Sequence, residues 1–137
     1  MTNVLPDRRR TILLVDDEPE VLRLFTRILS AEGTVMLKAR TGAEALAAAQ
    51  QTRLNLVILD IKLPDMSGTE VLRRIRRIDP GVPVIMVTSY GSVETVRTSM
   101  ELGAFDYLTK PFDNQEVRRV AREALASRAG GSVPSRA

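Results

Sequence analysis

The segment ILLVDDEP, residues 12–19, decides the class of fold. Four consecutive apolar residues are followed at once by three acidic residues and a proline. A short run that is apolar throughout, instead of alternating with polar residues, is typical of a strand covered on both faces of a sheet. Proline directly after such a run and its polar loop is typical of the first turn of a helix. The segment therefore predicts a buried strand, an acidic loop and then a helix.

The same alternation recurs along the rest of the chain. Four more short apolar runs occupy residues 35–37, 54–59, 84–87 and 105–108. Five stretches with apolar residues near a period of 3.6 lie within 21–29, 45–49, 71–78, 93–100 and 117–124. Glycines and prolines stand at the predicted element ends, and there is no internal repeat. Five strands alternating with five helices predict an α/β fold, a doubly wound five-stranded parallel sheet with helices on both faces.

The composition narrows the possible chemistry. The chain has 137 residues, of which 44% are hydrophobic and 27% charged, as in one ordinary globular domain. It contains no cysteine and no histidine. This excludes disulfides, metal sites built on thiolate or imidazole, and Ser-His-Asp or Cys-His catalysis. Any acid, base or nucleophile must come from Asp, Glu, Lys, Ser, Thr or Tyr.

Charge and hydropathy predict the cellular location of the chain and its contacts with membranes and nucleic acids. Its longest apolar run, residues 45–49, is far shorter than the about 20 residues of a membrane span, and no signal peptide is recognisable. We therefore expect a cytoplasmic protein without membrane contact. The net charge is +3, but residues 1–10 and 128–137 each carry +2, which leaves −1 for residues 11–127. We expect a basic flexible tail, a folded domain over 11–127 and a Gly/Ser/Pro linker-like tail, with no direct nucleic-acid binding.

Polar residues follow four of the five predicted strands. Asp16 and Asp17 follow the first strand, Asp60 the third, Thr88 the fourth and Lys110 the fifth. Ligands of open parallel sheets bind beyond the carboxyl ends of the strands, so these side chains should converge there. Converging carboxylates repel one another unless a cation intervenes, and Mg²⁺ prefers such oxygen ligands. A carboxylate beside Mg²⁺, a lysine and a hydroxyl can receive a phosphoryl group.

Each of these residues also has a purely structural interpretation. The acidic pair before Pro19 could cap a helix, and Asp60 could be a solvated turn residue. Thr88 could cap the following helix, and Lys110 could be an ordinary surface charge. A tyrosine in a strand, such as Tyr107, is usually a packing residue with its hydroxyl at the rim. Only the combination of these residues favours a phosphoryl-transfer site.

With these residues in view, the sequence resembles the receiver domains of response regulators in two-component signalling. The matching motifs are LVDDEP (14–19), LDIKLPDMSG (59–68), VTS (87–89) and DYLTKPF (106–112). The resemblance extends over residues 11–127, and the part from 90 to 112 is most similar to receivers of the nitrogen-regulatory class of activators. It implies a flavodoxin-like sheet of order 2-1-3-4-5 with five flanking helices.

The resemblance also implies a role for each residue of the acidic site. Asp60 would be the phosphoacceptor. Asp16, Asp17, Asp60 and the backbone carbonyl of Lys62 would hold Mg²⁺, for which Mn²⁺ could substitute. Lys110 would pair with the phosphoryl oxygens.

Further residues would transmit or tune the signal in such a domain. Thr88 would bind the phosphoryl group, and Tyr107 would report its arrival to the face formed by the fourth helix, fifth strand and fifth helix. The side chains of Lys62 and Tyr90 would tune the lifetime of the phosphoryl group. The peptide bond between Lys110 and Pro111 is a candidate for the cis isomer.

The function implied is a phosphorylation switch without turnover of a free metabolite. A sensor histidine kinase or phosphotransfer protein would be the donor, and a downstream protein or an output domain the target. Nucleic acid would be reached only through such an output domain, and phosphorylation could drive homodimer formation through the fourth and fifth helices. A degenerate receiver that only binds proteins is the main alternative. An aspartyl-phosphate phosphohydrolase is disfavoured, because it would need an acidic residue at the position of Lys62. A flavin-binding electron carrier is also disfavoured, because the acidic loop 16–18 would repel the phosphate of the flavin.

Overall fold

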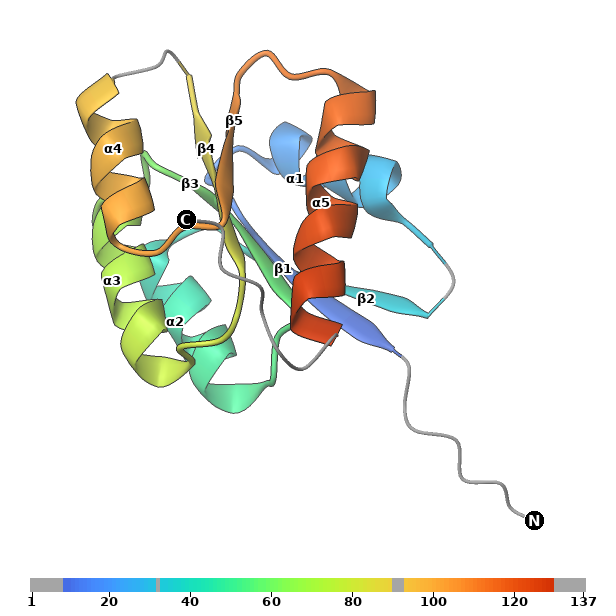
Figure 1. Ribbon diagram of the computed structural model, residues 1–137, viewed down its shortest axis with the longest axis horizontal. Helices are drawn as coiled ribbons and strands as arrows, with labels where there is room; N and C mark the ends of the chain where they lie inside the picture. The colour runs from blue at the N-terminus through green and yellow to red at the C-terminus, as the bar shows by residue number, and fades with distance from the viewer. Residues whose placement is uncertain (1–8, 32, 90–92, 130–137) are drawn as a thin grey trace.

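The computed structural model describes residues 9–31, 33–89 and 93–129 (Figure 1). The strands are β1 (Arg10–Val15), β2 (Thr34–Ala39), β3 (Leu56–Asp60), β4 (Val84–Thr88) and β5 (Asp106–Thr109). The helices are α1 (Pro19–Leu29), α2 (Gly42–Gln51), α3 (Gly68–Ile78), α4 (Val93–Glu101) and α5 (Asn114–Ala129). All strand pairs are parallel and the sheet order is β2-β1-β3-β4-β5. The predicted fold class and strand order are confirmed.

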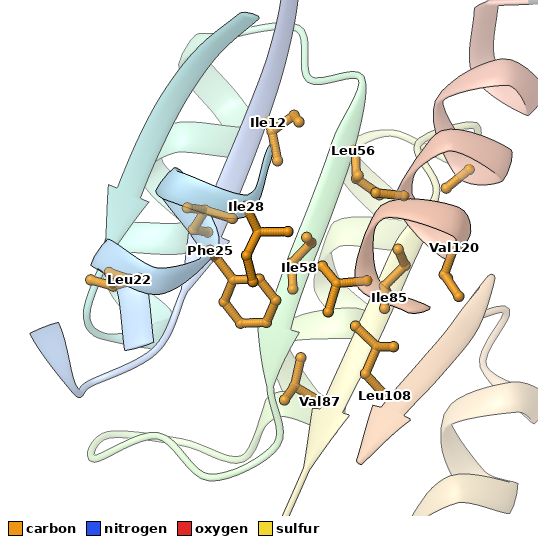
Figure 2. Packing of buried hydrophobic residues seen from close by; sticks show 14 residues of the cluster. Ile12, Leu22, Phe25, Ile28, Leu56, Ile58, Ile85, Val87, Leu108 and Val120 are labelled. Carbon is orange, nitrogen blue, oxygen red and sulfur yellow. The ribbon is translucent and has the colours of Figure 1, made fainter. Parts of the chain in front are cut away.

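The three central strands are apolar along most of their length, where both faces of the sheet are buried. Alternate residues of β1, β3 and β4 point to opposite sides of the sheet. On one side, Ile12, Ile58 and Ile85 belong to one hydrophobic cluster with Phe25, between the sheet and helices α1 and α5 (Figure 2). The stacked ring of Phe112, whose centroid lies 4.8 Å from that of Phe25, closes this core near the carboxyl ends of the strands.

The second core lies on the opposite side of the sheet. Leu13, Leu59 and Met86 project from β1, β3 and β4 toward helices α2 and α3. Val71, Leu72 and Ile75 of α3 are fully buried against them. Figure 1 shows α2, α3 and α4 together on this side and α1 and α5 on the other. The edge strands β2 and β5 are only partly buried, which agrees with their more polar sequences.

Regular secondary structure extends past residues 11–127 at both ends. Strand β1 begins at Arg10, and α5 continues to Ala129. Arg128, which the sequence analysis assigned to the tail, has a side chain only 9% exposed and donates to both carboxylate oxygens of Asp79, at 2.6 and 3.2 Å. This ion pair fixes the last turn of α5 against the turn that follows α3. Among the described residues, no helix combines the length and the apolar character needed to cross a bilayer.

Candidate functional site

The loop after β1 gathers three carboxylates at the carboxyl edge of the sheet. Asp16 is buried, whereas Asp17 and Glu18 are exposed. The Asp16 N–H donates to the Ala39 carbonyl at 3.1 Å, and the Glu18 N–H donates to Asp16 Oδ1 at 2.9 Å. One carboxylate oxygen of each of these acids lies within 4.8 Å of the others. The loop therefore presents a compact set of hard oxygen donors beside the central strands.

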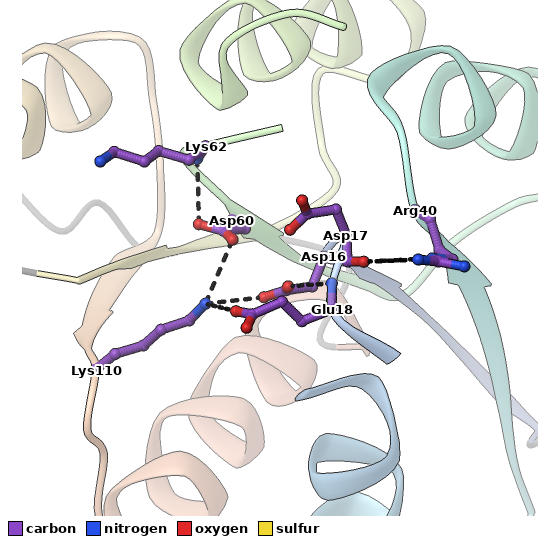
Figure 3. Close-up of polar contacts among 7 residues, drawn as sticks. All are labelled: Asp16, Asp17, Glu18, Arg40, Asp60, Lys62 and Lys110. Carbon is purple, nitrogen blue, oxygen red and sulfur yellow. Dashed lines mark hydrogen bonds and ion pairs between the residues drawn. The ribbon is translucent and has the colours of Figure 1, made fainter. Parts of the chain in front are cut away.

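Lys110 connects this loop to the end of β3. Its ammonium nitrogen Nζ lies 3.1 Å from Asp16 Oδ2 and 3.3 Å from Asp60 Oδ2 (Figure 3). It also lies 3.6 Å from Glu18 Oε1. The backbone N–H of Lys110 donates to the Thr88 carbonyl at 2.7 Å, and the Lys110–Pro111 peptide bond is cis. The lysine thus stands between carboxylates that come from two different strands, and the expected cis bond is present.

Asp60 is the last residue of β3 and is only 6% exposed. Its Oδ1 accepts a hydrogen bond from the Lys62 N–H at 3.1 Å. The following loop returns tightly against the strand, because the Gly68 N–H donates to the Ile61 carbonyl at 2.6 Å. The carboxylate is therefore held from both sides, by the Lys62 amide and by the ammonium group of Lys110.

Burial and charge act against each other in this cluster. Burial raises the pKa of Asp60, and the neighbouring Asp16 charge raises it further, while the Lys62 amide and Lys110 lower it only in part. Burial would lower the pKa of Lys110, but its hydrogen bonds and charge interactions with Asp16 and Asp60 raise it overall. Three carboxylates, those of Asp16, Glu18 and Asp60, surround one ammonium group, and the Asp17 carboxylate lies close to two of them. The site therefore favours the arrival of additional positive charge.

The donors fit a hard divalent cation. Mg²⁺ is bound by carboxylate and carbonyl oxygens and keeps several waters. The exposed side chains of Asp17 and Glu18 leave space for such waters, and the end of β3 contributes the buried carboxylate of Asp60. Asp16, Asp17 and Glu18 form one set of closely spaced carboxylates. Asp60 lies beside this set, because Lys110 pairs with both Asp16 and Asp60. The absence of cysteine and histidine from the sequence also favours oxygen-preferring cations.

The remaining predicted residues lie at different distances from this centre. Thr88 is buried at the end of β4, next to Thr109 in the sheet register. Tyr107 lies on the edge strand β5 and is 42% exposed. The Lys62 side chain is exposed and leads away from the carboxylates in Figure 3. Tyr90 lies outside the described residues.

Three polar side chains at this edge make contacts that were not expected from the sequence. Glu18 was read as part of the acidic loop, but its ion pair with Lys110 was not foreseen. Arg40 donates from Nη2 and Nε to the Asp17 carbonyl, at 3.0 and 3.3 Å. Asp65 accepts from the N–H groups of Gly42 and Ala43. No local pattern marks the last two contacts, because each joins segments more than 20 residues apart.

The comparison with known families identifies the chain. Residues 12–122 match the family described as the response regulator receiver domain. The chain belongs to this family, which confirms the resemblance read from its motifs. It is a receiver domain of two-component signalling.

Individual relatives agree with this assignment. The chain is 38% identical over 114 residues to sporulation initiation phosphotransferase F of Bacillus subtilis, covering 83% of this chain and 92% of that protein. It matches a CheY-like receiver domain from Methanospirillum hungatei with a TM-score of 0.85 and 36% identity, over 90% and 99% of the two chains. The receiver domain of NtrX from Brucella abortus matches with a TM-score of 0.79 and 36% identity, over 85% and 98%. Several other curated relatives are transcriptional regulators of which this chain spans about half the length or less.

Proposed function

We propose that this receiver domain takes a phosphoryl group from a phosphohistidine onto Asp60. An oxygen of the Asp60 carboxylate forms a bond to phosphorus as the bond between phosphorus and the histidine nitrogen breaks, and that nitrogen keeps the electron pair. The observation that carries the proposal is the position of Lys110 Nζ, 3.3 Å from Asp60 Oδ2 and 3.1 Å from Asp16 Oδ2. Phosphoryl transfer depends mainly on such positioning and charge neutralisation.

The acidic residues supply the second part of the site. Mg²⁺, with Mn²⁺ as a substitute, would be held by Asp16, Asp17, Asp60 and the backbone carbonyl of Lys62. When bound, the cation neutralises charge on the phosphoryl oxygens. Lys110 orients the acceptor carboxylate and pairs with the incoming oxygens, and the Lys62 N–H holds the other acceptor oxygen in place.

Phosphorylation would then shift the population of a pre-existing conformer. Thr88, buried at the end of the strand beside Asp60, binds the phosphoryl group with its hydroxyl. Tyr107 changes rotamer in response and alters the surface of α4, β5 and α5. Lys62 and Tyr90 set how long the modification lasts. The donor would be a sensor histidine kinase or a phosphotransfer protein in the cytoplasm, and the target a downstream protein or an output domain.

Intact-mass spectrometry after incubation with acetyl phosphate tests this proposal. The wild type should gain one phosphoryl group when Mg²⁺ is present and none without it. The Asp60→Asn variant should gain none under either condition. A wild type that gains no mass with Mg²⁺ would refute phosphoacceptance and favour a receiver that acts only as a protein-binding module.

A further inference from the structure

The turn between β2 and α2, residues 40–43, contacts both loops of the acidic site but supplies no group to the proposed chemistry. Strand β2 lies beside β1 in the sheet, so this turn lies next to the acidic loop 16–18. Helix α2 packs against α3, so the turn also lies next to the loop that follows Asp60. The position between two functional loops raises the question of whether the turn holds them in place.

Arg40 makes the contact to the acidic loop. Its guanidinium group donates to the Asp17 carbonyl oxygen from Nη2 at 3.0 Å and from Nε at 3.3 Å, as seen in Figure 3. The backbone of the turn is itself held, because the Arg40 N–H donates to Glu44 Oε1 and the Glu44 N–H donates to Thr41 Oγ1. Thr41 caps α2 through the Glu44 N–H, and the Glu44 carboxylate holds the backbone of Arg40, the residue before the cap.

Asp65, in the loop that follows Asp60, makes the second contact of this turn. Its Oδ1 accepts from the Gly42 N–H at 2.8 Å, and its Oδ2 accepts from the Ala43 N–H at 2.9 Å. These amides lower the pKa of the Asp65 carboxyl, so it stays ionised at neutral pH. Met66 packs on Gly42 so closely that a Cβ there would come within 2.5 Å of Met66 Cγ. The loop after Asp60 is thus pinned to α2 by polar and apolar contacts together.

We propose that this turn is a brace, with Arg40 and Asp65 as positioning residues that hold the two ligand-bearing loops at the spacing a Mg²⁺ ion requires. The inference rests on the metal site of the proposed function. Mg²⁺ demands near-ideal octahedral geometry, so a small displacement of either loop weakens its binding. Groups that orient metal ligands typically change metal affinity by about 10–100-fold when removed.

The test is a calorimetric Mg²⁺ titration of the whole chain and three variants. Arg40→Met and Asp65→Asn each remove one contact of the brace, and both side chains are exposed, so folding is preserved. Asn55→Ala is the matched control, because Asn55 Oδ1 accepts from the Thr11 N–H at 2.9 Å at the opposite edge of the sheet. We expect the Kd for Mg²⁺ to rise on the order of tenfold in each brace variant and to stay unchanged in the control.

The sign of the Arg40 effect separates positioning from simple charge. Removing a positive charge beside an acidic site would by itself tighten Mg²⁺ binding, whereas removing the Asp65 charge would weaken it. Positioning predicts weaker binding in both variants, and the loss persists at 1 M salt, where the Debye length is about 3 Å. Tighter or unchanged binding by Arg40→Met, or an equal loss in Asn55→Ala, would overturn the brace.

The titration also separates this inference from the proposed function. A wild type that binds Mg²⁺ but gains no phosphoryl group from acetyl phosphate would refute the phosphoacceptor proposal, and weaker binding in both brace variants would still support the brace. A wild type that binds no Mg²⁺ would overturn the brace together with the metal site. Normal Mg²⁺ affinity in both brace variants, with normal labelling of the wild type, would overturn the brace alone.

Discussion

Replacing Gly68 by alanine should displace the phosphoacceptor strand end. Gly68 is the first residue of α3. A Cβ at this position would overlap the Asp60 carbonyl oxygen and lie 2.7 Å from Ile61 Cα. Both neighbours are backbone atoms, which cannot rotate away as a side chain can. The substitution therefore either moves the α3 start or shifts Asp60 relative to Lys110.

The expected change in stability follows from two opposing effects. Alanine is favoured over glycine in a helix by up to about 1 kcal/mol, which alone would stabilise the variant. Overpacking of this kind costs about 1–3 kcal/mol, and a backbone neighbour places the cost at the upper end. We expect Gly68→Ala to lower the free energy of unfolding by about 2 kcal/mol, which corresponds to roughly 8 °C in Tm for a domain of this size.

Urea denaturation measures this difference, and Gly42→Ala provides the control. Gly42 is also the first residue of a helix, but a Cβ there meets side-chain atoms, at 2.5 Å from Met66 Cγ and 2.9 Å from Val71 Cγ2. Its cost should be about 1 kcal/mol, below that of Gly68→Ala, because Met66 can change rotamer and the overlap with Val71 is slight. Gly68→Ala should also slow labelling by acetyl phosphate. A Gly68→Ala variant as stable as the wild type, or an equal loss in both variants, would refute the close-approach argument.

Other predictions concern the charged groups and the α4–β5–α5 face. Because the folded pKa of Asp60 is raised, its stabilising contribution is complete below pH 3.8 and is lost as the pH rises through the folded pKa. Without metal, Asp60→Asn should therefore melt at a higher temperature than the wild type at pH 7, and a lower Tm would contradict this. Lys110→Met leaves Asp16 and Asp60 without the ammonium group that pairs with them. It should lower the free energy of unfolding in urea by on the order of 3 kcal/mol and abolish labelling by acetyl phosphate. An unchanged urea midpoint would refute the role of these ion pairs. Asp79→Asn removes the charged partner of Arg128 and should lower the free energy of unfolding by on the order of 2 kcal/mol, since Asp79 is 26% exposed. An unaltered denaturation curve would refute this role of the ion pair. Phosphorylation should produce a dimer detectable by light scattering with a phosphoryl mimic, and identical mass in both states would exclude it.

Much of the fold and the centre of the site could be predicted from the sequence. Strands buried on both faces read as unbroken apolar runs, so β1, β3 and β4 were recognisable without any structure. Parallel strands deliver their carboxyl ends to one edge, so Asp16, Asp60 and Lys110 could be expected to meet there. The contacts of Lys110 with both carboxylates in the structure agree with that expectation.

The contacts that hold the site together were decided only by tertiary structure. Arg40, Asp65 and Arg128 each bond to a residue that lies more than 20 positions away. Such pairs leave no periodic or local signal, because they depend on which strands are neighbours and how the helices pack. The order β2-β1-β3 brings the turn at 40–43 beside both functional loops. The residues at the strand ends therefore indicated the chemistry of the site from the sequence alone. The contacts that hold those residues in position depend on the packing of segments that are distant in the sequence.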